Sequence, residues 1–279
     1  MYGGAVEGDS NGNATCNKVT FENGTIQGGV LGGYSSSGAA GGTDAGAGNT
    51  VTISGGTLNW LVAGGWSETG EASGNTVNFN GGKLYVTDSA ADGKVYGGYS
   101  LGGAVENNTV NMNGGTISGT KTPGNNDPWA VYGGLSYSES GAAGNATGNT
   151  VTFGTGSAST AGVVGSDAVY GGRSWATGSD SGNSGDVTKN KVSIGGGTVK
   201  GYVYGGRSGS EKGASGAATE NEVAISGGTL TTIDVYGGYT AGNTGSGDAT
   251  ENKVTVSGGT FKSKTSITGG ISNAEANSN

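Results

Sequence analysis

Few side chains in this 279-residue sequence can perform acid–base or nucleophilic chemistry. Histidine is absent and Cys16 is the single cysteine, so neither a Ser-His-Asp triad nor a Cys-His pair can form within the chain. The remaining candidates are carboxylates, whose closest sets are Glu68 with Glu71, Asp88 with Asp92, and Glu220 with Glu222. Paired carboxylates can cleave a glycosidic bond, but dispersed acids in loops rich in Gly and Ser are explained by solvation alone. The sequence therefore favours a protein that is not an enzyme.

The sequence also lacks the usual motifs for metals, phosphates and nucleic acids. No Gly-Gly pair begins a Gly-Gly-x-Gly-x-Asp sequence, the calcium-binding pattern of repeats-in-toxin proteins, and no glycine-rich loop ends in Gly-Lys-Ser/Thr. The net charge is −8 and the 13 basic residues are scattered, whereas phosphate binding needs clustered Lys and Arg. We therefore expect no cofactor, no metal site and no nucleic-acid partner.

Aromatic residues recur at two positions around a repeated Gly-Gly pair. The position just before the pair holds Leu31, Ala63, Tyr96, Tyr132, Tyr170, Tyr204, Tyr236 and Thr268. The position just after the pair holds Tyr34, Trp66, Tyr99, Leu135, Arg173, Arg207, Tyr239 and Ile271. Exposed columns of this kind can stack on sugar rings or receive a protein partner. The alternative is structural, because stacked aromatic rings also stabilise solenoids or lie beneath closing loops.

These columns belong to a repeat of about 33 residues that runs through the chain. Each copy begins with Asn-x-Val-x-apolar, continues through Gly-Gly-Thr-apolar, and ends with Val, a variable residue and Gly-Gly. The copies begin at Asn17, Asn49, Asn75, Asn108, Asn149, Asn190, Asn221 and Asn252. Alternation of apolar and polar residues within each copy predicts β-strands with one face buried.

Four apolar positions per copy predict four inward-facing ladders. The first two are Val19, Val51, Val77, Val110, Val151, Val192, Val223 and Val254, and Phe21, Ile53, Phe79, Met112, Phe153, Ile194, Ile225 and Val256. The third is Ile26, Leu58, Leu84, Ile117, Ala158, Val199, Leu230 and Phe261. The fourth is Val30, Val62, Val95, Val131, Val169, Val203, Val235 and Ile267. A smaller fifth ladder is predicted from Ala14, Ala72, Val105, Ala146, Val187, Ala218 and Ala249.

One such unit cannot bury its apolar residues alone, whereas stacking covers each layer with the next. The sequence thus predicts a single all-β solenoid over residues 1–279, with about eight coils and glycine-rich corners at the Gly-Gly pairs. The Asn that begins each copy is predicted to form a hydrogen-bonded ladder or a turn. Insertions at Val86–Gly93, Ser118–Ala130 and Ser159–Ala168 are placed between the third and fourth ladders, on one side. An eight-bladed propeller and a coil with two turns per repeat are the alternative folds.

The pattern Asn-Thr-Val-Thr-Ile-Ser-Gly-Gly-Thr from Asn49, joined with Val-Tyr-Gly-Gly-Tyr-Ser from Val95, resembles repeats in the passenger regions of bacterial autotransporters and related surface adhesins. The resemblance covers nearly the whole chain. It implies a right-handed parallel β-helix, secretion across the outer membrane, and adhesion or surface display. It brings no catalytic residues.

From this resemblance we expect an adhesin or stalk segment at the bacterial cell surface, whose partner is a glycan or protein of a host or neighbouring cell. No signal peptide follows Met1, so we interpret the chain as a piece of a longer protein that reaches the membrane only through a barrel domain outside it. Unpaired edges at the terminal coils predict end-to-end association. A glycan-binding or glycan-cleaving β-helix is one alternative. An ice-binding solenoid is the other, suggested by Thr50 with Thr52 and Thr150 with Thr152 but weakened by charged residues in the same columns.

Overall fold

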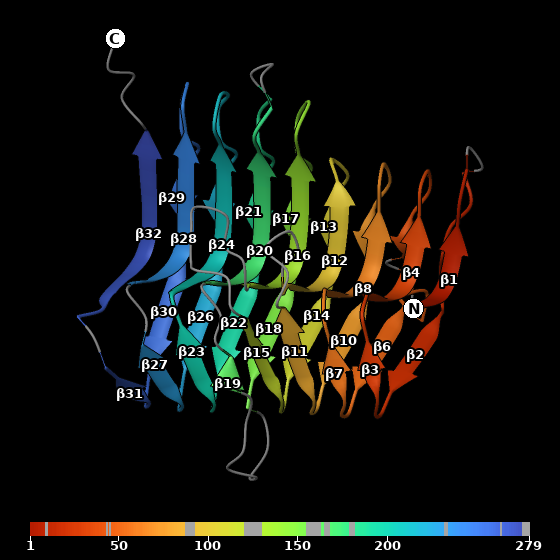
Figure 1. Cartoon of the computed structure of the whole chain (residues 1–279). Helices are drawn as coiled ribbons and strands as arrows, with labels where there is room; N and C mark the ends of the chain where they lie inside the picture. The colour runs from red at the N-terminus through yellow and green to blue at the C-terminus, as the bar shows by residue number, and fades with distance from the viewer. Residues whose placement is uncertain are drawn as a thin grey trace.

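The protein is a parallel β-helix in which four strands per coil build four sheets along the molecule (Figure 1). The structure, a computed structural model, describes residues 1–279 except 9–10, 43, 45, 87–92, 120–129, 155–162, 165–167, 179–181, 232–233, 263 and 275–279. Within that part of the chain every strand pairs in parallel with the strand at the same place in the neighbouring coil. This pairing confirms the solenoid and excludes a propeller, and partners about 33 residues apart exclude two turns per repeat.

Sheet A contains the long strands that end each repeat, seen side by side from right to left in Figure 1. Its strands are β1 (Tyr2–Val6), β4 (Val30–Ser35), β8 (Val62–Ser67), β12 (Val95–Leu101), β16 (Ala130–Ser138), β20 (Ala168–Ala176), β24 (Tyr202–Ser210), β28 (Asp234–Gly242) and β32 (Ser266–Ala274). Short strands of sheet B follow them along the chain. These are β5 (Ala40–Gly41), β9 (Ala72–Ser73), β13 (Val105–Glu106), β17 (Ala146–Thr147), β21 (Val187–Thr188), β25 (Ala218–Thr219) and β29 (Ala249–Thr250).

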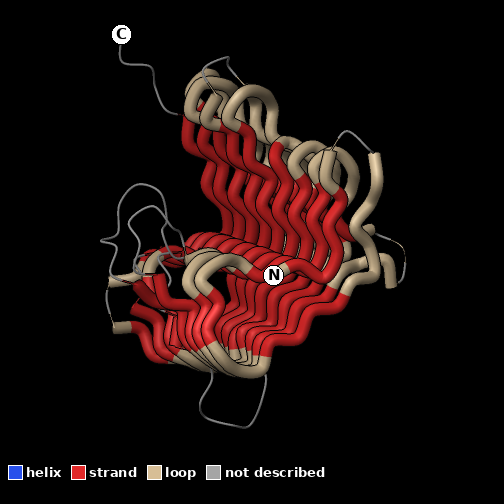
Figure 2. Tube along the Cα trace, turned by 45° about the vertical axis from the view of Figure 1, so that its right-hand side comes forward, coloured by secondary structure: helices blue, strands red, loops and turns tan. Residues whose placement is uncertain are grey.

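Sheets C and D form the other two sides of each coil, and Figure 2 shows the strands of successive coils nested behind one another. Sheet C consists of β2 (Lys18–Phe21), β6 (Thr50–Ile53), β10 (Thr76–Phe79), β14 (Thr109–Met112), β18 (Thr150–Phe153), β22 (Lys191–Ile194), β26 (Glu222–Ile225) and β30 (Lys253–Val256). Sheet D consists of β3 (Thr25–Ile26), β7 (Thr57–Leu58), β11 (Lys83–Val86), β15 (Thr116–Gly119), β19 (Val163–Val164), β23 (Thr198–Lys200), β27 (Thr229–Thr231) and β31 (Thr260–Phe261).

The interior of the coils is filled by the predicted apolar ladders. Val51 pairs with Val77 and Val77 with Val110, and the same register continues through the first two ladders. Side chains of the first, second and fourth ladders form one buried cluster with those of the third. Burial ends in the last coil, where Val256 is 43% and Ile267 46% exposed. The ladder prediction is thus confirmed in its main columns.

Two ladders needed correction. Val164, not Ala158, pairs with Ile117 and with Val199, so the long insertion in that copy precedes the third ladder instead of following it. Ala158 itself, like most residues of the three insertions, lies outside the described residues. The fifth ladder gains Ala40, which bridges Ala14 and pairs with Ala72. The prediction placed this ladder three residues before each Asn and so missed Ala40, because eight residues, instead of two, lie between Ala40 and Asn49.

The predicted asparagine ladder runs through the buried corner between sheets B and C. The side-chain Nδ2 of each inner Asn donates to Oδ1 of the Asn in the next coil. The distance between these two atoms is 2.9 Å from Asn49 to Asn75 and 3.0 Å from Asn75 to Asn108. Nδ2 also donates to a sheet B carbonyl, and Oδ1 accepts the backbone N–H of the preceding Asn. Each inner amide therefore has all its hydrogen-bonding capacity satisfied, which a buried polar group requires.

The two kinds of Gly-Gly pair have different roles, so the prediction that both are corners was wrong. The pair before Thr lies in the turn from sheet C to sheet D, with positive φ at its second glycine, as at Gly56 (φ 76) and Gly228 (φ 81). The pair after Val lies inside the strands of sheet A. There a Cβ on Gly97 would lie 2.9 Å from Cβ of Asn108, and one on Gly98 would lie 2.6 Å from its Cγ. Close packing of the Asn ladder requires glycine at both positions.

Candidate binding face

Both aromatic columns lie on the outer face of sheet A, because the Gly-Gly pair shifts the alternation of the strand by one residue. In β12, Val95 points into the apolar interior, whereas Tyr96 belongs to a separate cluster outside the coil. Gly97 and Gly98 both face Asn108. After the pair, the alternation of inward and outward side chains is therefore shifted by one residue. As a result, the rings of Tyr96 and Tyr99 both lie on the outer face, with centroids 5.1 Å apart.

The tyrosines before the Gly-Gly pair form one continuous stack from Tyr96 to Tyr236. Neighbouring ring centroids lie 4.9 Å apart for Tyr132 and Tyr170 and 5.0 Å apart for Tyr170 and Tyr204, with nearly parallel planes. The column faces away from the valines, as predicted, but it is not an exposed stripe. Tyr170 is fully buried and Tyr204 is 5% exposed. The physical reason is that each ring covers the face of the next, which favours the structural interpretation for these four residues: Tyr96, Tyr132, Tyr170 and Tyr204.

More accessible side chains flank this stack. These half-buried residues are Tyr34, Trp66, Arg173, Arg207, Tyr236 and Tyr239, whereas Tyr99 and Leu135 are buried. Trp175, which the sequence analysis did not select, joins them two residues after Arg173. It could have been found from the register, since Tyr137 and Trp175 occupy the same column in neighbouring strands.

The two arginines lie among aromatic rings in consecutive coils. Arg173 Nη1 donates to the hydroxyl of Tyr132 at 3.3 Å, and Arg207 Nη1 donates to that of Tyr170 at 3.2 Å. The guanidinium of Arg207 also lies 4.8 Å from the ring centre of Trp175. Burial opposes the charge of Arg207, but the neighbouring Tyr170 leaves its pKa above the ordinary value. Cation–π contacts of this kind hold both cations in place on the outer face.

The tyrosines of this face ionise with difficulty. Burial raises the pKa of Tyr99 and of Tyr204 well above the ordinary range. Burial and the nearby Asp234 raise the pKa of Tyr236 to about 12. At neutral pH these phenols are therefore protonated and uncharged, and the positive charge of the face comes from its arginines.

The predicted carboxylate pairs that the structure describes, Glu68 with Glu71 and Glu220 with Glu222, are exposed or half-buried. Lys189 contacts Glu220 at 3.7 Å and Lys191 contacts Glu222 at 3.2 Å, so each acid has its own lysine. Glu68 accepts a hydrogen bond from Tyr34 at 2.7 Å, and Glu71 is exposed in the following loop. Asp88 and Asp92 lie outside the described residues. No group of three His, Cys, Asp or Glu side chains suited to a metal ion occurs in the part of the chain that is described.

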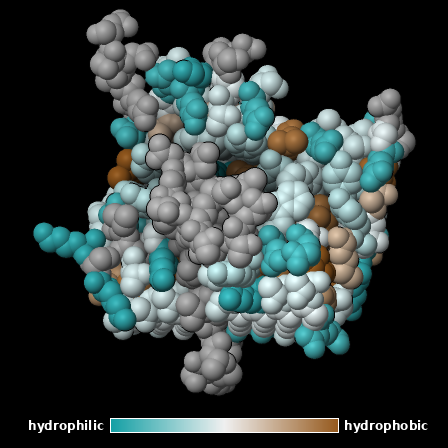
Figure 3. Space-filling model, viewed as in Figure 1, coloured by the Kyte–Doolittle hydropathy of each residue, from teal (hydrophilic) through white to brown (hydrophobic). Residues whose placement is uncertain are grey.

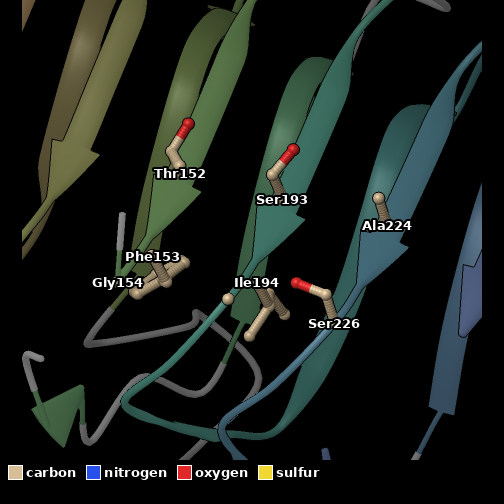
Figure 4. Close-up of a pocket in the computed structure, with 8 residues that line it drawn as sticks. Thr152, Phe153, Gly154, Ser193, Ile194, Ala224 and Ser226 are labelled. Carbon is tan, nitrogen blue, oxygen red and sulfur yellow. The ribbon is translucent and has the colours of Figure 1, made fainter. Parts of the chain in front are cut away.

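A shallow hollow crosses β18, β22 and β26 of sheet C (Figure 4). Thr152, Ser193 and Ala224 lie at one level along its upper side, and Phe153 and Ile194 lie near the turn below. It contains no titratable side chain, so it offers neither acid–base chemistry nor charge. The column of Thr150 continues into Lys191 and Glu222, confirming that its row of hydroxyl groups is interrupted.

A buried serine column went unnoticed in the sequence. It follows the second aromatic column and consists of Ser35, Ser67, Ser100, Ser136, Ser174, Ser208 and Thr240. Ser67 Oγ donates to the carbonyl of Gly38 in the preceding coil and accepts from the N–H of Gly70, both at 2.8 Å. Through such hydrogen bonds, the serine side chains hold the loops between sheets A and B against the coil. The sequence could have revealed this column, because a Ser or Thr stands two positions after the second glycine in each of these repeats.

Among the described residues no helix is long and apolar enough to cross a bilayer. Comparisons with protein-family models, with curated proteins and with solved structures found no match to this chain.

Proposed function

We propose that this chain is a non-enzymatic β-helix segment of a secreted or cell-surface bacterial adhesin, whose outer face on sheet A binds a glycan or protein of another cell. The observation that carries the proposal is the segregation of side chains on that face. Aromatic and arginine residues are held in register there from coil to coil, in a column that only Leu135 interrupts: Trp66, Tyr99, Leu135, Arg173, Arg207 and Tyr239. Half-buried aromatic groups and arginines are the side chains enriched at binding interfaces.

Sheet C supports the proposal by contrast. Its outward positions carry Thr, Ser, Asn, Lys and Glu, the composition of an ordinary solvated surface. Separate lysine partners for Glu220 and Glu222 favour a binding role over a hydrolytic one, because a catalytic pair needs its acids to act together. Location at the cell surface and attachment through a domain outside this chain are parts of the same proposal.

The test is binding of the purified chain to a glycan array and to intact cells, with Trp175→Ala and Arg207→Ala as variants. We expect each to weaken binding about tenfold, the scale of an interface hot spot. Thr52→Ala on the outer face of sheet C is the matched control and should bind like the parent chain. Thermal melting of each variant separates lost binding from lost structure.

Two results would overturn the proposal. One is release of reducing sugar from a polysaccharide, abolished by changing a single carboxylate, which would make the chain an enzyme. The other is equal binding by the parent chain and by both sheet A variants, which would move the binding site elsewhere.

A further inference from the structure

At the N-terminal end of sheet A, a hollow of about 240 Å³ opens on the outer face. Its walls are the rings of Tyr2, Tyr34, Trp60 and Trp66, and the carboxylates of Glu7 and Glu68 stand at its side. Trp60 is 43% exposed, so the hollow is open to solvent. Figure 3 shows hydrophobic surface between paler and teal residues over this part of the molecule, near β4 and β8.

The hollow exists because the tyrosine stack stops before it reaches these coils. The column that holds Tyr96 and Tyr132 in later coils holds Leu31 and Ala63 here, and neither side chain fills the space of a phenol ring. Leu31 and Leu61 therefore line the hollow. The second column keeps its aromatic rings as Tyr34 and Trp66, which form the wall.

The wall is held in place from outside. Trp66 packs on Tyr99 with ring centroids 4.1 Å apart, and Tyr2 meets Tyr34 edge to face at 5.8 Å. Tyr34 donates its hydroxyl to Oε1 of Glu68 at 2.7 Å. Burial, followed by this bond to Glu68, raises the pKa of Tyr34 to about 12, so the phenol remains the donor at neutral pH.

The side chains that line the hollow carry a net negative charge. Neither Glu7 nor Glu68 forms an ion pair with any described residue, and no Lys or Arg lines the hollow. The nearest cation along the chain, the amino group of Met1, is bound by the carbonyl of Gly29 at 2.8 Å. Carboxylates beside the negative faces of aromatic rings attract a cation and disfavour an anion.

We infer that this hollow binds a trimethylammonium group, such as the head of choline. Aromatic walls with carboxylates beside them are the arrangement by which proteins recognise quaternary ammonium ions. Leu31 and Leu61 supply apolar contact for the methyl groups, which cannot donate hydrogen bonds. A volume of about 240 Å³ suits one such head group and is below the size of drug-sized ligand sites.

The inference rests on the proposed function, because it names a ligand class for one end of the same outer face. The two can fail separately. Cell binding that persists without choline binding would sink only the inference, whereas choline binding by a chain that attaches to no cell would sink only the adhesin proposal.

The experiment is a titration of the full chain with choline chloride, in which binding is measured by calorimetry and by tryptophan fluorescence. The uncharged isostere 3,3-dimethyl-1-butanol tests the charge, and ethanolamine tests the methyl groups. We expect choline to bind at least fivefold more tightly than either. Equal affinity for the neutral isostere, or tighter binding of methyl glucoside than of choline, would overturn the inference.

Variants locate the site. Glu68→Gln, Glu7→Gln and Trp60→Leu should each weaken choline binding about three- to fivefold, the scale of one exposed cation–π or charge contact. Glu139→Gln is the matched control, because Glu139 accepts a hydrogen bond from Tyr137 at 3.3 Å on the same face but lies outside the hollow. Choline affinity unchanged in all three site variants would overturn the assignment.

Choline groups occur free and on membrane lipids, and flotation with phosphatidylcholine vesicles distinguishes these sources. Co-flotation that is lost in Glu68→Gln assigns the hollow to a lipid head group. Binding of free choline without co-flotation assigns it to a soluble ligand. Both results support the inference, and absence of both contradicts it.

Discussion

Both faces of sheet A carry a buried column of side chains, but the two columns are buried by different means. On the inner face, Val203 is fully buried among apolar ladders contributed by three sheets. On the outer face, Tyr204 is 5% exposed and stacks between Tyr170 and Tyr236 of the neighbouring coils, with Tyr239 and Arg207 beside its ring. A solenoid can therefore have a second packed layer outside its coil. Parallel strands buried on both faces are expected to carry nearly continuous apolar runs, and here glycine and serine replace them where the Asn ladder and loops approach.

The inner face should tolerate charge least. Val203→Asp places an unpaired carboxylate in the fourth ladder, where no cation or water can compensate it. We expect a loss of about 4 kcal/mol or more, seen as loss of the cooperative melt or fraying into separate ends. Retention of a single melt close to that of the parent chain would contradict the inward assignment.

The outer face should behave as a second core. Tyr170→Ala removes a fully buried ring from the middle of the stack, and we expect a loss of about 3–5 kcal/mol by chemical denaturation, the scale of a core aromatic deletion. Tyr170→Phe keeps the ring but removes the acceptor of Arg207, so it should cost about 1 kcal/mol. A loss below about 1 kcal/mol for the alanine variant would mean that the column is only a surface stripe.

The glycines between the two faces can be tested directly. A Cβ on Gly206 would lie 2.5 Å from Cγ of Asn221, so Gly206→Ala should cost about 1–3 kcal/mol by overpacking. Gly245→Ala is the control, because nothing lies within 4 Å of the added Cβ. Equal melting temperatures for the two variants would show that the asparagine ladder accommodates an added methyl group without loss of stability.

Alkaline pH should distinguish the faces, because only the outer one titrates. The pKa of Tyr204 is higher in the folded chain than the unfolded value near 10, so its contribution to stability is complete below about pH 10. That contribution is lost as the pH rises toward the folded pKa. We expect the free energy of unfolding to fall above about pH 10, and less steeply in Tyr204→Phe. Identical profiles for the two chains would contradict the burial of this phenol.

Much of this architecture could be predicted from the repeat alone. The columns of Val51 and Asn49 were readable because one residue type recurs at one spacing, and stacking requires like side chains to lie above one another. The position of Val164 was not readable, because an insertion obscured the spacing before it. The burial of Tyr170 was only one of two alternatives from the sequence, since alternation gives the face of a residue but not what covers that face. The hollow beside Trp66 was visible only as two non-aromatic residues, Leu31 and Ala63, at the start of the tyrosine column.

The asparagine ladder has a consequence for how this molecule can change in length. Every inner amide makes the same bonds to the coil on either side, so neighbouring coils meet through the same joint at this corner. Removing or duplicating one whole repeat therefore leaves each remaining joint intact and alters the rod by one inter-strand step of about 4.8 Å. The reach of the protein can vary in such steps without any new interaction having to arise.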